Sequence, residues 1–450
     1  MRIHFIAVGG SIMHSLAIAM VRDGHDVSGS DDEIYEPARS RLRQAGILPD
    51  KTGWSSERIT PEIESAILGM HALADNPELL ASQRLGIPIY SFPEFVAERC
   101  DKKKRVVICG SHGKTTITSA VMHVLRHDGV EFDFVVGSKV PGFEHQVELT
   151  ADRPLIVIEG DEYLSSAIDA RPKFMHYRPD LCVITGIAWD HMNVFPTIES
   201  YRLQFELLIK SMMPGSVLIA NTSDPSLNEL INRCAHHLTV ITYETPEFEP
   251  SIGGWKLKLS GSWVQTGLIG RHNMENLVAV NIVCKRLGVS DGEFATAISS
   301  FKGPARRLEL LKSNERSVVF NDFAHAPSKV QATINAVREQ FPKRKLIAVI
   351  ELHTYSSLNR EFLVQYKDTA RDADRLIVFL NHHAMQQKGL EVNADEVLSA
   401  FDHSDAVVIS TSDQLLEQLS LPLDNTSLLM MSSGNFNGMD LQALANLAIP

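Results

Sequence analysis

The sequence predicts an α/β protein built from parallel sheets with helices packed on them. Short runs rich in β-branched residues alternate with helical stretches along most of the chain, which is the pattern of strand–helix–strand units. The 450 residues are enough for about three domains of ordinary size. Within this pattern, one strand leads into a glycine loop that ends in lysine and two threonines, which indicates a phosphate-binding site.

Composition excludes several classes of protein. The net charge of −12 argues against a nucleic-acid partner, which would favour a basic face. The five cysteines are odd in number and form no Cys-x-x-Cys pair, so neither a disulfide framework nor a zinc cluster is predicted. No run reaches the ~20 apolar residues that span a bilayer, and the N-terminus lacks a secretory signal. We expect a cytoplasmic protein with no membrane association and no obligate protein partner.

The first block, residues 2–99, begins with a strand, a glycine turn and a helix, as dinucleotide-binding domains do. Gly9 and Gly10 form the turn, and Asp31 follows about twenty residues later, where an acid commonly binds a ribose hydroxyl. The fingerprint is incomplete, since Ala7 and Ile12 stand where two glycines are expected. Nucleotide binding and a plain tight turn are therefore both open. Further strands are predicted at Asp26–Gly29, Ser65–Gly69 and Ile87–Tyr90.

The most informative stretch is Arg105–Thr116, in which a strand ends in a tight loop before a helix. Backbone N–H groups of such a loop can converge on a polyphosphate, and glycine permits the curl. Lys114 adds a positive charge, and the hydroxyl of Thr115 at the helix start can bind Mg²⁺. Ile108 stands where the standard phosphate loop has its first glycine, so a strand-to-helix turn with an exposed lysine is the alternative. The predicted ATP contacts are Gly110, Ser111, His112, Gly113, Lys114, Thr115 and Thr116.

Two polar clusters follow predicted strands of the middle block. Glu159 comes directly after the strand Leu155–Ile158, and His191 follows the strand Leu181–Thr185. Because ligands of open α/β sheets bind at the carboxyl ends of strands, we expect both clusters to share a crevice with the phosphate loop. A solvated acid and a core histidine are the alternatives for each cluster alone. Oxygen ligands such as Thr115 and Glu159 suit Mg²⁺, whereas Mn²⁺ tolerates a histidine ligand better.

The rest of the chain continues the α/β pattern. A charged linker, Asp101–Arg105, precedes the phosphate loop, and a small hairpin region is predicted at Glu244–Gly267. The remaining predicted strands lie at Ser216–Ala220, Thr239–Thr242, Val318–Phe320, Leu346–Ile350, Arg375–Phe379, Ala406–Ile409 and Leu428–Met431, with a helix at Pro327–Phe341.

Two further segments could contact a nucleotide. Asn273 and Asn276 lie three residues apart at a helix start, and their amides suit a purine edge, although a capped helix start explains them equally well. Arg307 follows a Gly-Pro pair typical of a hinge and could reach a phosphate or form an interdomain salt bridge. Asp322 and His325 stand between a strand and a helix of the third block.

Taken together, six motifs resemble those of the Mur ligase family, the ATP-dependent amino-acid and peptide ligases of peptidoglycan synthesis and recycling. They occur in the family's order and extend over nearly the whole chain. The motifs are GSHGKTT, EGDE, WDHMNVF, GRHNMEN, ARRLE and NDFAHAP. The resemblance implies a Rossmann-like domain for a UDP-sugar at residues 1–101, a central P-loop ATPase-type domain at 102–303, and a Rossmann-like domain at 304–450 that binds the amino acid or peptide.

The resemblance also implies roles for the residues. The catalytic residues would be Lys114, Glu159 and His191. Thr115 and Glu159 would hold Mg²⁺, with His191 at a second metal. ATP would also contact Asn273, Asn276, Arg307, Asp322 and His325. The UDP-sugar would contact Gly9, Gly10, Ser11 and Asp31.

Within the family, the segments IHFIAVGGSIMHSLA and SGSD resemble members that accept UDP-N-acetylmuramic acid. Those members add either L-alanine or the tripeptide L-alanyl-γ-D-glutamyl-meso-diaminopimelate. The segments SDDEIYEP, DARPKFMHYRP, YSFPEF and MMSSGNFNG resemble the tripeptide-adding members. Ser357 stands where the L-alanine-adding members have an arginine, so a small amino acid would lose a carboxylate clamp. We expect the tripeptide as acceptor, with L-alanine as the alternative and Asn359, Arg360 and Asn435 as candidate peptide contacts.

The sequence departs from the family pattern at three places. Ser111 replaces a threonine, Gly160 replaces an alanine, and Tyr201–Glu206 lacks the lysine that several members carry in carbamoylated form. Two alternatives from other classes are a P-loop ATPase switch, which would hydrolyse ATP without a UDP-sugar, and a nicotinamide-dependent oxidoreductase. The oxidoreductase rests on the N-terminal glycine turn alone, and the phosphate loop argues against it.

Overall fold

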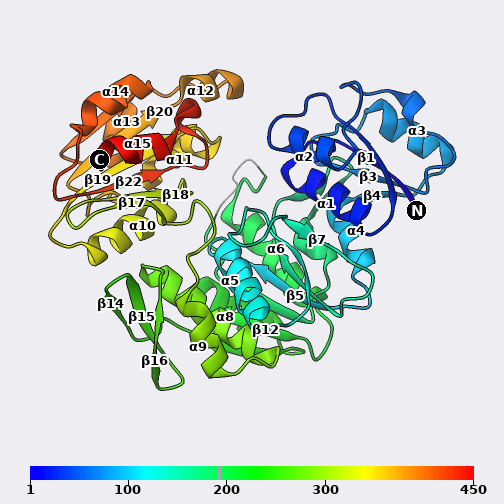
Figure 1. Cartoon of the computed structure of the whole chain (residues 1–450), viewed down its shortest axis with the longest axis horizontal. Coiled ribbons are helices and arrows are strands. Elements are labelled where there is room, and N and C mark those ends of the chain that lie inside the picture. The colour runs from blue at the N-terminus through cyan, green and yellow to red at the C-terminus, as the bar shows by residue number, and fades with distance from the viewer. Residues whose placement is uncertain (190–193) are drawn as a thin grey trace. The chain divides into compact units, whose positions relative to one another are not determined.

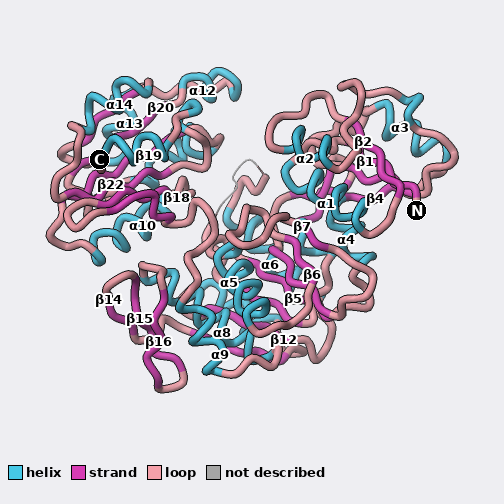
Figure 2. The backbone as a smooth tube through the Cα atoms, viewed as in Figure 1, coloured by secondary structure: helices cyan, strands magenta, loops and turns pink. Residues whose placement is uncertain are grey.

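The structure is a computed structural model that describes residues 1–189 and 194–450. Its strands form three large sheets and two small antiparallel ones (Figure 2). Figure 1 shows the course of the chain with its helices and strands labelled. The described chain divides into two compact units. The first unit contains Met1–Trp189, Thr197–Glu244 and Ala279–Ser290, and the second contains residues 194–196, Thr245–Val278 and Asp291–Pro450.

The first sheet has four parallel strands in the order β2-β1-β3-β4. Its strands are β1 (Arg2–Ile6), β2 (Asp26–Ser30), β3 (Ser65–Leu68) and β4 (Ile89–Ser91), and its helices are α1 (Ser11–Arg22), α2 (Ala38–Gln44), α3 (Pro77–Leu85) and α4 (Phe92–Arg99). A short 3₁₀ turn covers Ser56–Arg58. Strands β1 and β3 are almost fully buried, as expected of central parallel strands covered on both faces.

The second sheet has seven strands in the order β13-β12-β11-β5-β8-β6-β7, and only β7 runs antiparallel to its neighbour. The strands are β5 (Lys104–Cys109), β6 (Asp133–Val135), β7 (Val147–Glu148), β8 (Leu155–Glu159), β11 (Leu181–Ile184), β12 (Val217–Asn221) and β13 (Thr239–Tyr243). The helices are α5 (Lys114–His127), α6 (Ile198–Ser211) and α7 (Pro225–Cys234). Strand β5 pairs with both β8 and β11, so the loop after β5 emerges between the ends of these two strands.

Two small antiparallel sheets are also present among the described residues. Strands β9 (Leu164–Ser166) and β10 (Asp169–Pro172) form a hairpin. Strands β14 (Phe248–Ser251), β15 (Gly254–Leu259) and β16 (Ser262–Thr266) form a three-stranded antiparallel sheet, in which the buried Trp255 stacks on Phe248 at 5.0 Å between ring centroids. Helices α8 (Arg271–Arg286) and α9 (Asp291–Ser299) follow in sequence.

The third sheet has six strands in the order β17-β18-β22-β19-β20-β21, and only the edge strand β17 is antiparallel. The strands are β17 (Glu309–Ser313), β18 (Val318–Asp322), β19 (Lys345–Leu352), β20 (Arg375–Leu380), β21 (Ala406–Ile409) and β22 (Thr426–Met431). The helices are α10 (Pro327–Gln340), α11 (Arg360–Leu363), α12 (His382–Lys388), α13 (Ala394–Phe401), α14 (Ser412–Leu419) and α15 (Leu441–Ala448).

The three-domain α/β fold predicted from the sequence is confirmed, and each strand predicted there is present within a few residues. The linker Asp101–Arg105 is shorter than predicted, because β5 already begins at Lys104. The short strands β6, β7, β9, β10, β14 and β17 were not predicted. The boundaries at residues 101 and 303 stay predictions. Among the described residues, no helix has the length and apolar character needed to cross a membrane.

The departure from the family at Gly160 has a steric reason in this structure. A Cβ on Gly160 would lie 2.5 Å from Cys109 Sγ and 2.8 Å from Val107 Cγ1, both in the adjacent strand. The cysteine therefore occupies the space that an alanine would need.

We expect Gly160→Ala to lower the free energy of unfolding by about 1–3 kcal/mol, the usual effect of overpacking a core. Urea unfolding of this variant, of Cys109→Ala and of the double variant measures the effect. The double variant should be more stable than the sum of the two single changes predicts, because alanine at 109 removes the closer of the two contacts, that with Cys109 Sγ. Strictly additive effects would contradict this explanation.

Candidate functional site

The glycine loop after β5 adopts the tight curl predicted from its sequence. Gly110 has φ of 119° and Gly113 has φ of 77°, both in the left-handed region that favours glycine. A Cβ on Gly110 would lie 2.2 Å from Thr185 Oγ1, so this position has no room for a side chain. Helix α5 begins at Lys114, directly after the loop. The strand, loop and helix are therefore arranged as in a phosphate-binding loop.

The loop is fixed by hydrogen bonds to the segment that follows β11. Ser111 N donates to Gly186 O at 3.0 Å, and Ser111 Oγ donates to Ala188 O at 2.5 Å. Thr185 Oγ1 donates to His112 O at 2.5 Å. These bonds hold the loop backbone in one conformation before any ligand binds.

The start of α5 differs from the starts of several other helices. Asn76 caps α3, Ser91 caps α4 and Asp224 caps α7 through side-chain oxygens. In this described stretch no side chain caps α5, whose N-cap is Gly113, and its first turn carries no acid. The helix start is thus left without a side-chain cap, an arrangement that suits an anionic ligand.

Lys114 is held between the loop and a buried acid. Its Nζ donates to Gly110 O and to Glu162 Oε2, each at 2.6 Å. Glu162 is fully buried, and its other oxygen accepts from Tyr201 Oη at 3.2 Å. Burial lowers the pKa of Lys114, but the Glu162 and Asp161 carboxylates outweigh burial and raise that pKa above its usual value. The lysine is therefore a fixed positive charge beside the loop.

Thr115 and Glu159 form a pair of oxygen donors at the same sheet edge. Thr115 Oγ1 donates to Glu159 Oε1 at 2.7 Å, and Gly137 N donates to Glu159 Oε2 at 2.8 Å. A hydroxyl and a carboxylate in contact are the donor types that Mg²⁺ prefers, so these residues fit the predicted metal. His191, the predicted ligand of a second metal, lies outside the described residues.

A second group of potential metal ligands lies elsewhere in the first unit. Single donor atoms of Glu94, Asp169 and His176 lie within 4.8 Å of one another. Arg171 Nη2, however, contacts Asp169 Oδ2 at 2.8 Å and Glu94 Oε1 at 3.2 Å. The guanidinium already balances both carboxylates, so we interpret this group as an ion-pair cluster.

The N-terminal glycine turn is in contact with Asp31. Gly9 N donates to Asp31 Oδ2 at 2.6 Å, and α1 begins at Ser11 without a side-chain cap at its N-cap, Gly10. Ala7, which replaces a glycine of the fingerprint, nevertheless has φ of 67°. Burial and the neighbouring Asp32 raise the pKa of Asp31 to about 6.

One side chain of the first unit links the N-terminal turn to the oxygen pair. Gln146 Nε2 contacts Ser11 Oγ at 3.5 Å and donates to Gly137 O at 3.1 Å. Gly137 is the residue whose N–H binds Glu159. The predicted sugar-nucleotide turn and the predicted metal ligand are thus separated by one glutamine and one backbone residue.

The remaining predicted ATP contacts lie in the second unit. Asn273 and Asn276 are both buried; Asn273 Nδ2 donates to Ile269 O at 2.8 Å, and Asn276 Nδ2 donates to Asn273 Oδ1 at 3.5 Å. Their amides therefore lie together at the start of α8, as the i, i+3 spacing predicted. The charge of Asp322 acts on the pKa of His272, so Asp322 also lies near this helix start.

Asp322 orders the turn that carries Arg307. Its Oδ1 accepts from Leu308 N at 2.9 Å, and its Oδ2 accepts from Thr333 Oγ1 at 2.6 Å. The guanidinium of Arg307 lies 4.3 Å from the centroid of the Phe323 ring. His325 Nδ1 lies 3.0 Å from Phe323 O. The Asp322 carboxylate thus fixes the backbone of the turn, while the side chains of Arg307 and His325 both contact the Phe323 ring.

Sequence reasoning did not assign roles to Glu162 and Tyr201. Glu162 belongs to the acidic run after β8, so its position at a strand end was a usable signal. Tyr201 comes from α6, and its hydroxyl contacts both Ser111 Oγ, at 2.9 Å, and Glu162. Nothing in the spacing of the sequence predicts that contact.

These features define the class of protein. A phosphate loop after a central strand, a fixed lysine and a hydroxyl–carboxylate pair are the parts of a P-loop enzyme that acts on a nucleoside triphosphate. The sequence matches three domain families: the catalytic domain of the Mur ligase family at residues 2–104, the Mur ligase middle domain at 108–284, and the Mur ligase glutamate ligase domain at 306–434. The chain belongs to the Mur ligase family, whose members are ATP-dependent, amide-forming ligases of peptidoglycan synthesis that use a divalent metal.

Curated relatives of two kinds are similar to this chain. The UDP-N-acetylmuramate–L-alanyl-γ-D-glutamyl-meso-2,6-diaminoheptandioate ligase of Escherichia coli K12 is 28% identical, over 100% of this chain and 98% of the relative. The UDP-N-acetylmuramate–L-alanine ligase of Arthrobacter sp. FB24 is 30% identical, over 84% of this chain and 80% of the relative. The solved UDP-N-acetylmuramate–alanine ligase of Thermotoga maritima shares the fold, with a TM-score of 0.73 and 22% identity over 99% of this chain and 98% of that one.

We expect Lys114→Met to lower ATP turnover by about 10²–10³-fold, because the phosphates lose their fixed positive charge. ADP release in the presence of substrates measures this effect.

The matched control is the double variant Lys114→Met/Glu162→Gln. The single change leaves the buried Glu162 without its cation and should destabilise the fold, whereas the double variant removes both charges. The double variant should therefore recover stability in thermal unfolding but not turnover. Recovery of turnover would contradict the role of Lys114.

Proposed function

We propose that this chain joins the lactyl carboxylate of UDP-N-acetylmuramic acid to the α-amine of L-alanyl-γ-D-glutamyl-meso-diaminopimelate, in peptidoglycan recycling and in the cytoplasm. The observation that carries the ligase chemistry is the placement of Lys114 at the phosphate loop, with the Thr115–Glu159 pair one residue further along the helix. Similarity to the Escherichia coli relative supports both the sugar nucleotide and the tripeptide.

A cavity in the second unit supports a large acceptor. Its volume is about 960 Å³, and it lies beyond the ends of β19 and β20. Pockets of about 300–1,000 Å³ hold drug-sized ligands, so this cavity is far larger than one alanine requires. Its lining includes Arg360 and His382 as well as Glu361 and Glu391, a mixture that suits a peptide carrying both carboxylates and amines.

Ser357 gives a second argument for the tripeptide. Its side chain is almost fully buried, and its Oγ accepts from Thr354 N at 3.0 Å. A buried hydroxyl offers no cation to the carboxylate of free L-alanine. Of the candidate peptide contacts, Asn359 and Arg360 line the cavity, whereas the Asn435 side chain accepts from Gly438 N and is not among the lining residues.

The proposed reaction has two steps. The lactyl carboxylate attacks the γ-phosphorus of ATP, and the bond to the β,γ-bridging oxygen breaks, which gives an acyl phosphate and ADP. The α-amine of the tripeptide then attacks the acyl carbon, loses a proton, and expels inorganic phosphate. The first step brings two anions together, so a positive charge between them lowers the barrier. Lys114 supplies that charge from the protein and needs no movement of a flexible chain, because Glu162 already holds it.

Thr115 Oγ1 and Glu159 Oε1 are the proposed ligands of Mg²⁺, and Mn²⁺ is the alternative that a histidine ligand at His191 would favour. A divalent ion bound there supplies charge neutralisation of the β- and γ-phosphates. The chain's own contribution is orientation: Gly137 N–H holds the second oxygen of Glu159 and so fixes the plane of the carboxylate.

The other predicted contacts complete the proposal. The loop amides from Gly110 to Thr116 bind the phosphates, and the paired amides of Asn273 and Asn276 bind adenine. Arg307 and His325 contact ATP from the third domain, with Asp322 holding the turn between them. Gly9, Gly10, Ser11 and Asp31 bind the sugar nucleotide, with the α1 N-terminus facing its phosphates.

L-Alanine remains the second candidate acceptor, because relatives that use it reach 30% identity with this chain. Phosphate release with ATP, Mg²⁺ and UDP-N-acetylmuramic acid distinguishes the two. We expect kcat/KM with the tripeptide to exceed that with L-alanine by at least about tenfold, since an acceptor that fills the cavity makes contacts that alanine cannot make.

The control reactions omit one substrate at a time. Faster turnover with L-alanine would assign the chain to the addition of the first amino acid. Phosphate release with neither acceptor nor UDP-sugar would contradict a ligase and favour an ATPase switch.

We expect the KM for the UDP-sugar to rise as the pH falls below about 6, because Asp31 must be ionised to accept the hydrogen bond from a ribose hydroxyl. Asp31→Asn should remove this pH dependence and raise KM at neutral pH.

The raised pKa of Asp31 also predicts how the stability of the fold depends on pH. The folded protein favours the protonated form of Asp31. The contribution of Asp31 to the free energy of unfolding is therefore fully present below pH ~4 and is lost as the pH rises through about 6. Asp31→Asn should therefore be more stable than the wild type at pH 7, by up to about 3 kcal/mol. A KM that is flat between pH 5 and 8 in the wild type would contradict the assignment.

A further inference from the structure

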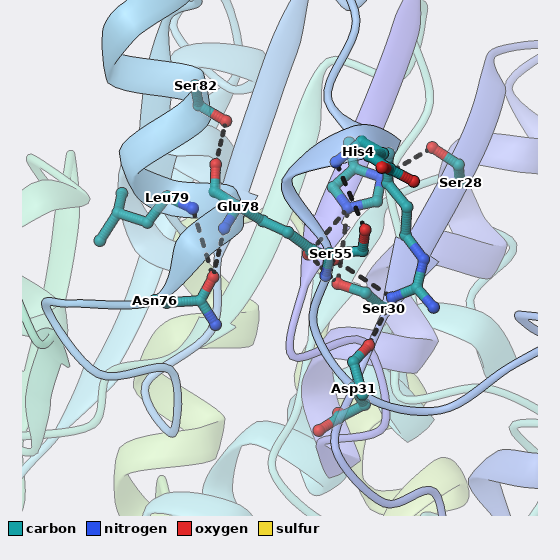
Figure 3. Close-up of polar contacts among 12 residues, drawn as sticks. His4, Ser28, Ser30, Asp31, Ser55, Asn76, Glu78, Leu79 and Ser82 are labelled. Atoms are coloured by element: carbon teal, nitrogen blue, oxygen red, sulfur yellow. Dashed lines mark hydrogen bonds and ion pairs between the residues drawn. The ribbon is translucent and has the colours of Figure 1, made fainter.

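A fully buried carboxylate lies beneath the N-terminal site and belongs to no predicted role. Glu78 stands in the first turn of α3, yet its side chain is 0% exposed and reaches across to the first sheet (Figure 3). Helix α3 does not need this acid as a cap, because Asn76 Oδ1 already accepts from Glu78 N and Leu79 N, at 2.9 and 3.2 Å. The carboxylate instead serves other parts of the domain.

One oxygen of Glu78 holds the end of β2. Ser30, the last residue of β2, donates its hydroxyl to Glu78 Oε2, and His4 Nε2 lies 3.3 Å from the same oxygen (Figure 3). His4 belongs to β1 and is itself held by a contact of 2.8 Å between its Nδ1 and Ser28 Oγ of β2. The residue after Ser30 is Asp31, so this side of the network fixes the backbone from which Asp31 projects.

The other oxygen of Glu78 holds the loop at residues 51–58. Ser55 N donates to Glu78 Oε1 at 2.9 Å, and Arg58 Nη1 lies 3.2 Å from it. Arg58 also donates to Gly53 O and to Lys51 O, so it gathers the loop around itself. Gly53 N in turn donates to the backbone oxygen of Asp31 at 2.8 Å. The network therefore reaches Asp31 from two sides.

The charge of Glu78 is stabilised where it lies. Burial alone would raise the pKa of Glu78, but the hydrogen bonds from His4, Ser30 and Ser55 hold it below its usual value. An ionised carboxylate with this many donors is rigid, because each donor would lose its partner if the side chain moved.

We propose that Glu78 is a positioning residue for the sugar-nucleotide site: its two oxygens hold the end of β2 and the loop 51–58, and thereby fix Asp31 for the ribose hydroxyls of the nucleotide. This inference rests on the proposed function, which assigns the sugar nucleotide to Asp31. Its physical basis is that a glutamine lacks the negative charge that pairs with Arg58. In addition, the NH₂ group of a glutamine would either face the donors Ser55 N–H and Arg58 or require Ser30 and His4 to accept instead of donate.

The test is Glu78→Gln in the full-length enzyme, assayed by phosphate release with each substrate varied in turn. We expect the KM for UDP-N-acetylmuramic acid to rise about tenfold, the effect of losing one charge-assisted hydrogen bond, while kcat and the KM for ATP stay within about twofold. A general loss of folding would instead lower kcat, whichever substrate is varied.

The matched control is Glu94→Gln, the same change in the first turn of the neighbouring helix. Glu94 Oε2 accepts from Ser91 N and Ser91 Oγ, both at 2.8 Å, and its Oε1 contacts Arg171 at 3.2 Å. These contacts hold the start of α4 and the ion-pair cluster, and they do not include β2 or the loop 51–58. This variant should leave the KM for the UDP-sugar unchanged. If Glu78→Gln fails to fold, Arg58→Met tests the loop side of the network, and its KM for the UDP-sugar should rise about threefold.

The outcomes separate the two proposals. A wild type that does not turn over UDP-N-acetylmuramic acid overturns the proposed function. An active wild type beside a folded Glu78→Gln variant with unchanged KM overturns the positioning role alone, as does an unchanged KM in Arg58→Met. An equal rise in KM in the Glu94→Gln control also overturns it, because the effect would then not be specific to the network.

Discussion

The ion pair between Lys114 and Glu162 is the contact on which the phosphate site depends. The loop that precedes the lysine depends on two glycines with left-handed backbone, and a chain with a net charge of −12 offers no general attraction for a polyanion. Glu162 is fully buried, orients the lysine at 2.6 Å, and is linked through Tyr201 to the loop residue Ser111. It therefore stabilises both the loop and the position of the positive charge. The positive charge of Lys114 is thus held at a defined position in a chain whose net charge is negative.

The order of the second sheet explains why distant residues meet at this point. Strand β5 lies between β8 and β11, and all three are parallel, so their carboxyl ends open at one edge. Glu159 and Glu162 come from β8 and its following segment, Thr185 from the residue after β11, and the loop from β5. Helix dipole, lysine and carboxylates can therefore act within one small region although they are up to about eighty residues apart in sequence.

The sequence predicted those parts of the fold and site that depend on local pattern. Buried strands were found because β-branched runs mark them, and Glu159 was found because it ends such a run. Tyr201 and Gly137 were not found, since their importance arises from contacts with Ser111 and Glu159 that only the folded chain creates. Ala7 shows a further limit: it takes the backbone conformation of the missing glycine, with φ of 67°, so an incomplete fingerprint still gave a complete turn. Short edge strands such as β7 depend on pairing and leave little trace in sequence.

Two acids of the N-terminal domain illustrate how burial alone does not decide what a carboxyl group does. Asp31 is nearly buried, accepts hydrogen bonds from the backbone N–H groups of Gly9 and Asp32, and has an acidic neighbour, and its pKa is raised to about 6. Glu78 is more deeply buried, yet its pKa is lowered, because the surrounding donors outnumber those around Asp31. An acid whose anion is incompletely satisfied by the protein can gain a hydrogen bond from a ligand, whereas an acid already surrounded by donors has nothing to gain. The different donor counts therefore support the proposed roles, Asp31 as a ligand contact and Glu78 as its support, and the first proposed role depends on the second because Ser30 joins them in the chain.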